Sequence, residues 1–407
     1  EIAQCLVGSE MCIRDSSRSY VPDQVQVTKK IYRMILKIAT ITFNHAHNHG
    51  SMLQTYALQQ FVYGLGNKAG AVIDYRVIDY HTDNQRAIYA VFKKNFSIKS
   101  LMKNLIAARH IFTLKKRHKK FEQFLKDYCS ITRCYRCPEE LMTEPPEADV
   151  YISGSDQLWN VRAKDFSEVY YLSFVKKGKR ISYAASLGPL KIDWEKYDTA
   201  KYASLLQNYA FISTREQGSA DNVEKLIGRQ PEIHVDPTLL LTKNEWRRIQ
   251  SDANYNNGNY ILLYSLEPTK LQLNMAKAIS KKLRLPIVVL RYNNKNDWFN
   301  SFVHRYDAGP CDFLSYIDHA ALVLSSSFHG TAFSLIYHKP FYVFNGLTDN
   351  RISSILTHTG LLNRSIATMD DISKVKIQPL NEKEIDNFLA KERLRSADYL
   401  CRAIALS

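Results

Sequence analysis

Short apolar runs alternate with longer amphipathic stretches along most of the chain. The runs at 36–42, 71–75 and 150–153 have the length of buried strands, and the stretch from Met52 to Leu65 repeats its apolar residues at helical spacing. This strand–helix–strand order predicts a parallel pair with a right-handed crossover. Further strands are predicted at 181–185, 211–214 and 233–235. The pattern indicates α/β architecture.

The alternation starts again after Asp236-Pro237. The sequence predicts strands at 260–264, 286–290, 321–325 and 340–344, with helices at 271–283, 313–319 and 330–337. We expect two Rossmann-like domains facing a central cleft, one over 34–240 and one over 241–407 that includes the terminal helices. Residues 1–33 have no hydrophobic period, so we expect a non-native or disordered N-terminal extension there.

Positive charge is concentrated in one part of the chain. The 407 residues include 55 Lys+Arg and 40 Asp+Glu, a formal net charge of +15. No acid lies between Asp83 and Glu122, yet this stretch carries 11 Lys and Arg, and its apolar residues fall at helical spacing. We therefore predict a basic helical insertion, 84–145, in the first domain. Its segment 84–121 either contacts an anionic membrane surface or is a solvated face.

Several classes of protein and site lose support from the sequence. It has no spanning apolar run, no signal peptide and no disulfide framework, so we expect a cytoplasmic protein, with peripheral contact at the inner face of the cell membrane left open. No nucleic-acid module is visible. The sequence also lacks phosphate-loop, dinucleotide and serine-hydrolase motifs. His45, His47 and His49 have no Cys or carboxylate close in sequence, so no metal site is predicted.

Polar clusters follow the predicted strands at their carboxyl ends, where open parallel sheets bind ligands. They come after the strands at 36–42, 150–153, 211–214 and 321–325. We take as substrate-binding candidates the residues Asn48, Gly50, Gln54, Asp156, Gln157, Trp159, Asn160, Ser327, Gly330 and Thr331. Asp156 either orients a substrate hydroxyl or braces its loop, and Trp159 either stacks on a sugar or anchors the core.

Two residues in these clusters are candidates for catalysis. His329 lies where a strand leads into a helix whose first backbone N–H groups can hold a phosphate or carboxylate, and its imidazole can transfer protons near neutral pH. Arg215 is suited to a bidentate grip on an anion. The alternatives are that His329 only caps the helix and that Arg215 forms an ion pair with Glu216 or another acid.

Several motifs occur in an order that resembles the polysaccharide pyruvyl transferase family. They lie at 41–50, 53–58, 73–76, 154–160, 181–188, 213–216, 236–240 and 326–332, and include Gly154-Ser155-Asp156-Gln157-Leu158-Trp159-Asn160 and Ser326-Ser327-Phe328-His329-Gly330-Thr331-Ala332. The resemblance implies a GT-B-like fold, no cofactor, and transfer of the enolpyruvyl carbon of phosphoenolpyruvate onto two sugar hydroxyls. The product would be a cyclic ketal on a surface glycan or its lipid-linked precursor. The family's donor-binding arginine and histidine match Arg215 and His329.

One position departs from the family pattern. Family members have an arginine two residues before the histidine, whereas this chain has Ser327. The missing cation would then come from Arg291, Lys339 or Arg351, and we include Arg351 among the substrate-binding candidates. Two alternative functions stay open: a GT-B-type glycosyltransferase that uses a nucleotide sugar, and a non-enzymatic protein that binds anionic membranes.

Overall fold

A computed structural model describes residues 35–90, 108, 110–188, 192–290 and 301–406. Met34–Ser407 forms one compact unit. The expectation for residues 1–33, and residues 91–107 and 109 of the predicted insertion, lie outside the described residues.

The first half of the unit is built on a parallel sheet. Its strands run in the order β3-β2-β1-β4-β5, and every neighbouring pair is parallel. A short parallel pair, β6-β7, continues beside β5 through single bridges such as Ile181 to Phe211. The strands are β1 (Ile35–Ile41), β2 (Val72–Tyr80), β3 (Ile131–Tyr135), β4 (Val150–Ser153), β5 (Lys179–Ser182), β6 (Ser213–Thr214) and β7 (Glu232–Ile233).

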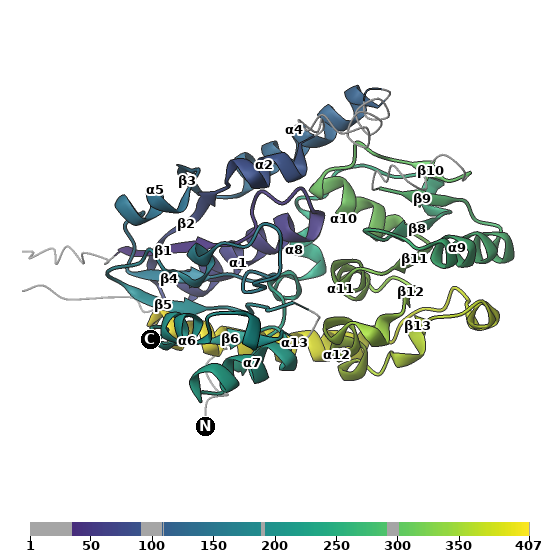
Figure 1. Ribbon diagram of the computed structural model, residues 1–407. Helices are drawn as coiled ribbons and strands as arrows, with labels where there is room; N and C mark the ends of the chain where they lie inside the picture. The colour runs from purple at the N-terminus through teal and green to yellow at the C-terminus, as the bar shows by residue number, and fades with distance from the viewer. Residues whose placement is uncertain (1–34, 91–107, 109, 189–191, 291–300, 407) are drawn as a thin grey trace, which may run out of the picture. The chain divides into compact units, whose positions relative to one another are not determined.

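The second half contains a six-stranded parallel sheet (Figure 1). Its strand order is β10-β9-β8-β11-β12-β13. The strands are β8 (Ile261–Tyr264), β9 (Ile287–Val289), β10 (Val303–His304), β11 (Leu322–Ser325), β12 (Phe341–Phe344) and β13 (Ser365–Ile366). The predicted class, α/β with two Rossmann-like sheets as in GT-B proteins, is confirmed; the central cleft and the boundary at 240 stay predictions.

Helices connect the strands of both sheets. In the first half they are α1 (His49–Lys68), α2 (Asp83–Tyr89), α4 (Ile111–Tyr128), α5 (Pro138–Thr143), α6 (Thr199–Gln207) and α7 (Gln217–Ile227). In the second they are α8 (Lys243–Arg247), α9 (Lys270–Leu283), α10 (Pro310–His319), α11 (Phe328–Ile336), α12 (Asn350–His358) and α13 (Glu382–Ile404). Short 3-10 turns include η3 (Pro237–Leu240), between β7 and α8.

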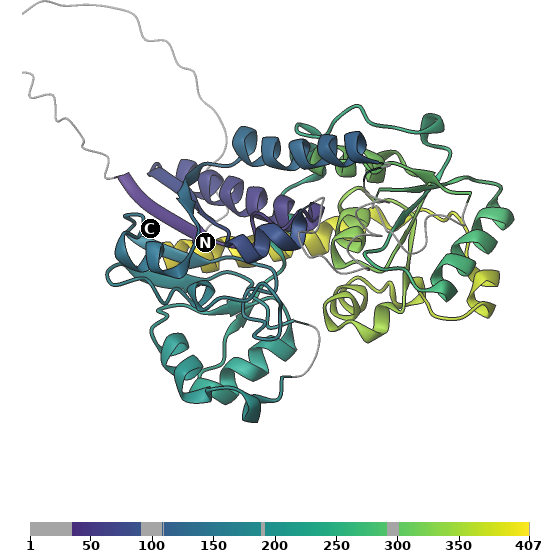
Figure 2. The same cartoon turned by 45° about the horizontal axis from the view of Figure 1, so that its top comes forward.

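One apolar core extends through both halves. Helix α1 begins at its N-cap Asn48, whose side chain accepts a hydrogen bond from the Gly50 N–H, and its apolar residues are buried. The same cluster of buried residues includes Leu53 of α1 and Phe313 of α10. Helix α13 (yellow in Figures 1 and 2) also contacts both halves, because Asp386 bonds His338 after α11 whereas Tyr399 donates to the Ser182 carbonyl of β5.

The basic segment differs from the prediction in one respect. Helix α4 is present, but the segment also contributes the edge strand β3, which pairs with β2. The β-branched and aromatic residues Ile131, Thr132 and Tyr135 favour this extended backbone at the sheet edge. The segment is therefore a β–α–β crossover as well as a basic insertion.

Some of the cations on α4 are paired within the protein. Lys116 lies 2.8 Å from Asp307, and Lys120 lies 2.5 Å from Asp312 in the first turn of α10. Lys115 and Lys119 are exposed, as is Phe112 at 86%. Only part of this cationic face is therefore available to an external partner.

Candidate functional site

The candidate residues gather where each sheet reverses its strand order. In the first sheet the reversal lies between β1 and β4, and in the second between β8 and β11. Ligands of open parallel sheets bind at such points, beyond the carboxyl ends of the strands. The loops after β1 and β4 and the start of α11 after β11 contribute to one connected set of side chains, described below.

A buried ion pair between Arg215 and Asp236 forms the centre of this set. Arg215 follows β6, and its Nη1 donates to Asp236 Oδ2 over 2.8 Å. Its Nε lies 3.4 Å from Glu216 Oε2, its Nη2 lies 4.0 Å from Asp156 Oδ1, and its guanidinium stacks over Phe328 at 5.1 Å. Burial alone would lower the pKa of Arg215, but the three carboxylates raise it above its ordinary value. Arg215 therefore stays a cation.

Asp236 links this arginine to His329. Its Oδ2 also accepts from Ser155 and lies 3.7 Å from His329 Nε2, while its Oδ1 caps η3 through the backbone and hydroxyl of Thr238. Burial opposes its ionisation, but His329 and Arg215 hold its pKa below the ordinary value. Asp236 is thus an ionised carboxylate held between the two catalytic candidates.

His329, in the first turn of α11, packs directly on the first turn of α1. A Cβ atom added to Gly50 would lie 2.0 Å from His329 Nδ1, so only glycine fits beneath the imidazole. His329 Nε2 and Arg215 Nη2 are both buried and have no hydrogen-bond partner among the described residues. Buried polar atoms usually have partners, so both atoms are suited to contact a substrate.

Asp156 connects the loop after β4 to α1. Its Oδ2 accepts from the Ser51 hydroxyl over 2.6 Å and its Oδ1 from the Gln157 N–H over 2.8 Å. Its φ of 79° lies in the left-handed region, which is uncommon for a residue other than glycine. The loop-bracing role is therefore visible, and contact with a substrate hydroxyl stays a prediction.

The start of α11 is tightly constructed. Ser327 is its N-cap residue, and its carbonyl accepts from both the N–H and the hydroxyl of Thr331. A Cβ on Gly330 would lie 2.2 Å from Ser325 Oγ, so a larger residue has no room there. The first backbone N–H groups of a helix lack intrahelical acceptors, which suits this end for an anion.

Four other candidates have structural partners. Asn48 is the α1 N-cap; Gln54 is fully buried and donates to Thr42 Oγ1; Asn160 donates to Gln157 Oε1. The structure thus gives these side chains bracing contacts, and their direct contact with substrate stays a prediction.

Trp159 has no exposed ring face in this structure. It is 0% exposed, stacks on Tyr171 at 5.3 Å and donates its indole N–H to the Tyr170 carbonyl. Stacking on a sugar requires an accessible face. Its surroundings therefore favour the core anchor, the alternative that the sequence left open.

The three cations proposed to replace the missing arginine differ in position. Lys339 precedes β12, at the edge opposite the strand ends that carry the site, and donates to the Asp318 carbonyl, so it cannot serve. Arg291 lies outside the described residues. Arg351, in the first turn of α12, forms a bidentate pair with Asp349. Burial alone would raise the pKa of Asp349, but Arg351 and Arg215 lower it below its ordinary value. Arg351 therefore stays the candidate.

Most of the chain matches a known protein family. The family model described as polysaccharide pyruvyl transferase matches residues 48–346. This chain belongs to that family. The match includes every catalytic candidate and the whole set of side chains from α1 to α11.

Comparison with other proteins gives more distant likenesses. No curated protein matches the chain. UDP-GlcNAc 2-epimerase from Neisseria meningitidis is similar at 11% identity and a TM-score of 0.49, over 92% of this chain and 100% of that one. UDP-N-acetylglucosamine 2-epimerase from Rickettsia bellii is similar at 12% identity and a TM-score of 0.49, over 91% of this chain and 99% of that one. E. coli heptosyltransferase WaaC is similar at 11% identity and a TM-score of 0.39, over 83% of this chain and 98% of that one. The fold assignment rests on the strand order and register given above.

Three residues of this connected set of side chains were not among the predicted candidates. They are Asp236, Glu216 and Ser51, each bonded to a predicted residue. Asp236 and Glu216 occur in the family motifs, so motif position could have identified them. Ser51 had no such signal, because its role depends on the packing of α1 beside the loop after β4.

The site contains more carboxylates than an anion-binding pocket requires. Asp156, Asp236 and Glu216 surround one guanidinium, and the imidazole of His329 lies 3.7 Å from Asp236. Hydroxyl donors stabilise all three carboxylates: Ser186 and Ser219 donate to Glu216, Ser51 donates to Asp156, and Ser155 and Thr238 donate to Asp236. Arg215 Nη2 and the first backbone N–H groups of α11 are donors in this set that are suited to an anion.

No helix among the described residues has both the length and the apolar content needed to cross a bilayer.

Proposed function

We propose that this transferase moves the enolpyruvyl group of phosphoenolpyruvate onto two hydroxyls of a sugar in a surface glycan or its lipid-linked precursor. Family membership supports a pyruvyl transfer. The observation that carries the proposal is a pair of buried nitrogens, Arg215 Nη2 and His329 Nε2, which have no hydrogen-bond partner among the described residues and lie on either side of Asp236. A small, highly charged donor needs such fixed donors in a site shielded from water.

The proposed chemistry assigns one task to each group. Arg215 Nη2, with the backbone N–H groups that begin α11, binds the carboxylate or phosphate of the donor. His329 delivers a proton to the donor methylene carbon, which becomes a methyl group, and the central carbon becomes cationic. One sugar oxygen bonds to that carbon; the C–O bond to phosphate then breaks and the second sugar oxygen bonds. One of the two hydroxyl protons replaces the proton that His329 delivered, and the other protonates the phosphate.

Asp236 acts through its neighbours in this scheme. Its carboxylate orients Arg215 by a 2.8 Å hydrogen bond and, at 3.7 Å from His329 Nε2, orients the imidazole. Asp156 orients an acceptor hydroxyl, with Ser51 holding its second oxygen. Gly50 allows the imidazole to approach α1 closely.

Single substitutions test these roles. We expect Arg215→Ala and His329→Ala each to abolish phosphate release from phosphoenolpyruvate and to leave the protein folded. Arg247→Gln is the control, because Arg247 is likewise an arginine paired with a carboxylate but lies away from the site. Both of its hydrogen bonds go to Asp318. Mass spectrometry of the acceptor should show the gain of pyruvic acid less one water. Full activity in either alanine variant would remove the role assigned to that residue.

We also propose that α4 brings the enzyme to an anionic membrane that carries the lipid-linked acceptor. Phe112 is 86% exposed, and Lys115 and Lys119 follow it at intervals of three and seven residues, on one face of the helix. An aromatic residue among lysines is suited to the interface of an anionic bilayer. Lys116 and Lys120 do not take part, since they pair with Asp307 and Asp312.

A further inference from the structure

Histidines and acids gather beside the loop after β1, apart from the residues assigned to pyruvyl transfer. His45 lies on this loop, and Asp79 and His81 lie at the carboxyl end of β2, the neighbouring strand. His45 Nε2 lies 2.5 Å and His81 Nδ1 lies 2.9 Å from the same oxygen, Asp79 Oδ1. Two imidazole nitrogens thus converge on one carboxylate.

We propose that His45, Asp79 and His81 bind a divalent transition-metal ion of the zinc class. Two histidines and one carboxylate form a donor set that suits zinc and its neighbours, and three protein ligands leave a position for water or a fourth ligand. One ligand atom from each residue lies within 4.8 Å of the other two. Ligands at ordinary zinc distances are about 3.4 Å apart around a tetrahedral ion, so small side-chain shifts suffice.

The surroundings fit this ion. The three side chains are 11–14% exposed, so the ion would be shielded but reachable. Cys134 on β3 pairs in register with Asp79, and its Sγ lies 3.9 Å from both nitrogens of His81. Cys134 is thus placed to supply a fourth ligand.

Glu122 is placed to orient His45. Its Oε1 lies 3.9 Å from His45 Nδ1, the nitrogen that faces away from Asp79. A metal-bound histidine commonly donates its other N–H to a carboxylate, which fixes the ring. Glu122 Oε1 also lies 3.1 Å from His47 Nε2, so its carboxylate is fixed beside His45.

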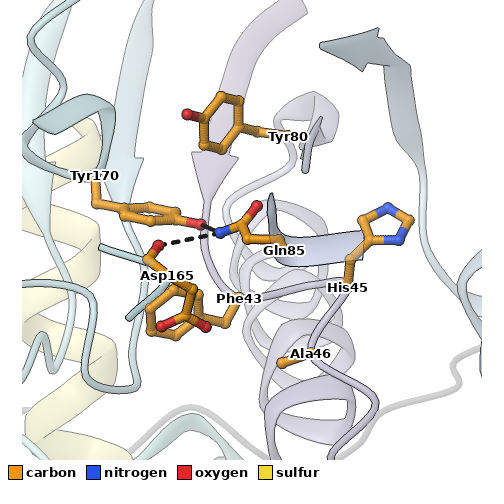
Figure 3. Close-up of a pocket in the computed structure, with 7 residues that line it drawn as sticks. All are labelled: Phe43, His45, Ala46, Tyr80, Gln85, Asp165 and Tyr170. Atoms are coloured by element: carbon orange, nitrogen blue, oxygen red, sulfur yellow. Dashed lines mark hydrogen bonds between the residues drawn. The ribbon is translucent and has the colours of Figure 1, made fainter. Parts of the chain in front are cut away.

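A small pocket lies beside the proposed site (Figure 3). Gln85 crosses it and donates to the Tyr170 hydroxyl at 2.7 Å and to the Asp165 carbonyl at 3.2 Å. The lining residues are Phe43, His45, Ala46, Tyr80, Gln85, Asp165 and Tyr170. His45 is shared between the pocket and the donor set, but its imidazole points away from the other lining side chains, so the pocket lies behind the proposed site and does not open onto the ion.

Arg86 competes with the ion. Its Nη2 donates to His81 Nε2 at 2.7 Å, which keeps the proton of the neutral ring on Nδ1. Coordination through Nδ1 moves that proton to Nε2 and so breaks the bond to Arg86. The Arg86 side chain is 38% exposed and can turn toward solvent. Replacing Arg86 with glutamine, which removes the positive charge, should therefore strengthen metal binding.

A second group, His47, His118 and Glu122, could also hold an ion. His118 is exposed, and Glu122 is already bonded to His47. The first group is the stronger candidate, because its two nitrogens share one oxygen and all its members are largely buried. The two sites can be separated by substituting His81 and His118 individually.

Isothermal titration of the chelator-treated full chain with Zn²⁺, and absorption spectra with Co²⁺, test the proposal. We expect one tight site, at least about tenfold weaker in His81→Ala and in Asp79→Asn, and tighter in Arg86→Gln. His118→Ala and His338→Gln should bind as the parent does; His338 also contacts a carboxylate, Asp386, but belongs to neither group. Circular dichroism of each metal-free variant checks its fold.

Three results would overturn the proposal. They are a folded parent protein that binds neither ion, binding unchanged in both His81→Ala and Asp79→Asn, and binding lost only in His118→Ala. None of these readouts depends on pyruvyl transfer, so the two proposals can fail separately.

Discussion

Replacing Gly50 with alanine should disable the site while the fold survives. The added Cβ would lie 2.0 Å from His329 Nδ1, and ordinary contact begins at 3.4 Å, so the ring must retreat by about 1.4 Å. The imidazole cannot move freely, because its side chain is only 8% exposed and lies against Asp236 and Phe328. A misplacement of about 1 Å at a reacting group can cost roughly 100-fold in rate.

The effect on stability should be much smaller than the effect on rate. Overpacking costs about 1–3 kcal/mol, and alanine in a helix recovers up to about 1 kcal/mol relative to glycine. Gly64→Ala is the matched control, since Gly64 is in the same helix and a Cβ there meets nothing within 4 Å. We would measure kcat/KM for phosphate release with phosphoenolpyruvate and a glycan acceptor, and unfolding in urea. Wild-type kcat/KM in Gly50→Ala would refute the assignment of His329.

Three further predictions concern charge. Asp156→Asn removes a negative charge that lies 4.0 Å from Arg215 Nη2. Phosphoenolpyruvate should therefore bind several-fold more tightly in calorimetry, while turnover falls. Weaker binding would contradict the proposed position of the donor at Arg215 Nη2. The pKa of Asp236 in the folded protein is lowered from its ordinary value of 3.8. Ionised Asp236 therefore contributes fully to the free energy of unfolding above pH 3.8, and this contribution declines by about 1.4 kcal/mol per pH unit below it. Urea unfolding between pH 5 and 3 should show a smaller loss in Asp236→Asn than in the parent, because other carboxylates with lowered pKa values, such as Asp79 and Glu122, contribute to the loss in both proteins. Lys115→Gln with Lys119→Gln should weaken sedimentation with anionic vesicles about tenfold, whereas exposed Lys126→Gln should not.

The sequence was informative about elements whose signal is local. The strand at 150–153 and the helix over 271–283 appear within a residue of the prediction, because continuous apolar runs and capped amphipathic stretches are read directly from the chain. The edge strand β3 was missed, since the neighbouring basic helix dominated the pattern of its segment. β10 and β13 have two residues each, too short for any period to show.

Contacts between distant residues could not be predicted in the same way. Spacing indicated His329 and Arg215, but the ionised Asp236 between them depends on how β7 and α11 meet. The histidines after β1 were judged unsuitable for metal because no acid lies near them in sequence. The fold brings Asp79 from β2 to His45 and Glu122 from α4 to His47, across 34 and 75 residues of sequence.

Direct calorimetry of donor binding tests the central proposal most simply. Phosphoenolpyruvate should bind the parent protein at one site per chain, and Arg215→Gln and His329→Gln should lose most of that binding. UDP-GlcNAc, as a representative nucleotide sugar, should give no heat of binding. Binding of the nucleotide sugar with no binding of phosphoenolpyruvate would contradict the proposed donor and favour a glycosyltransferase.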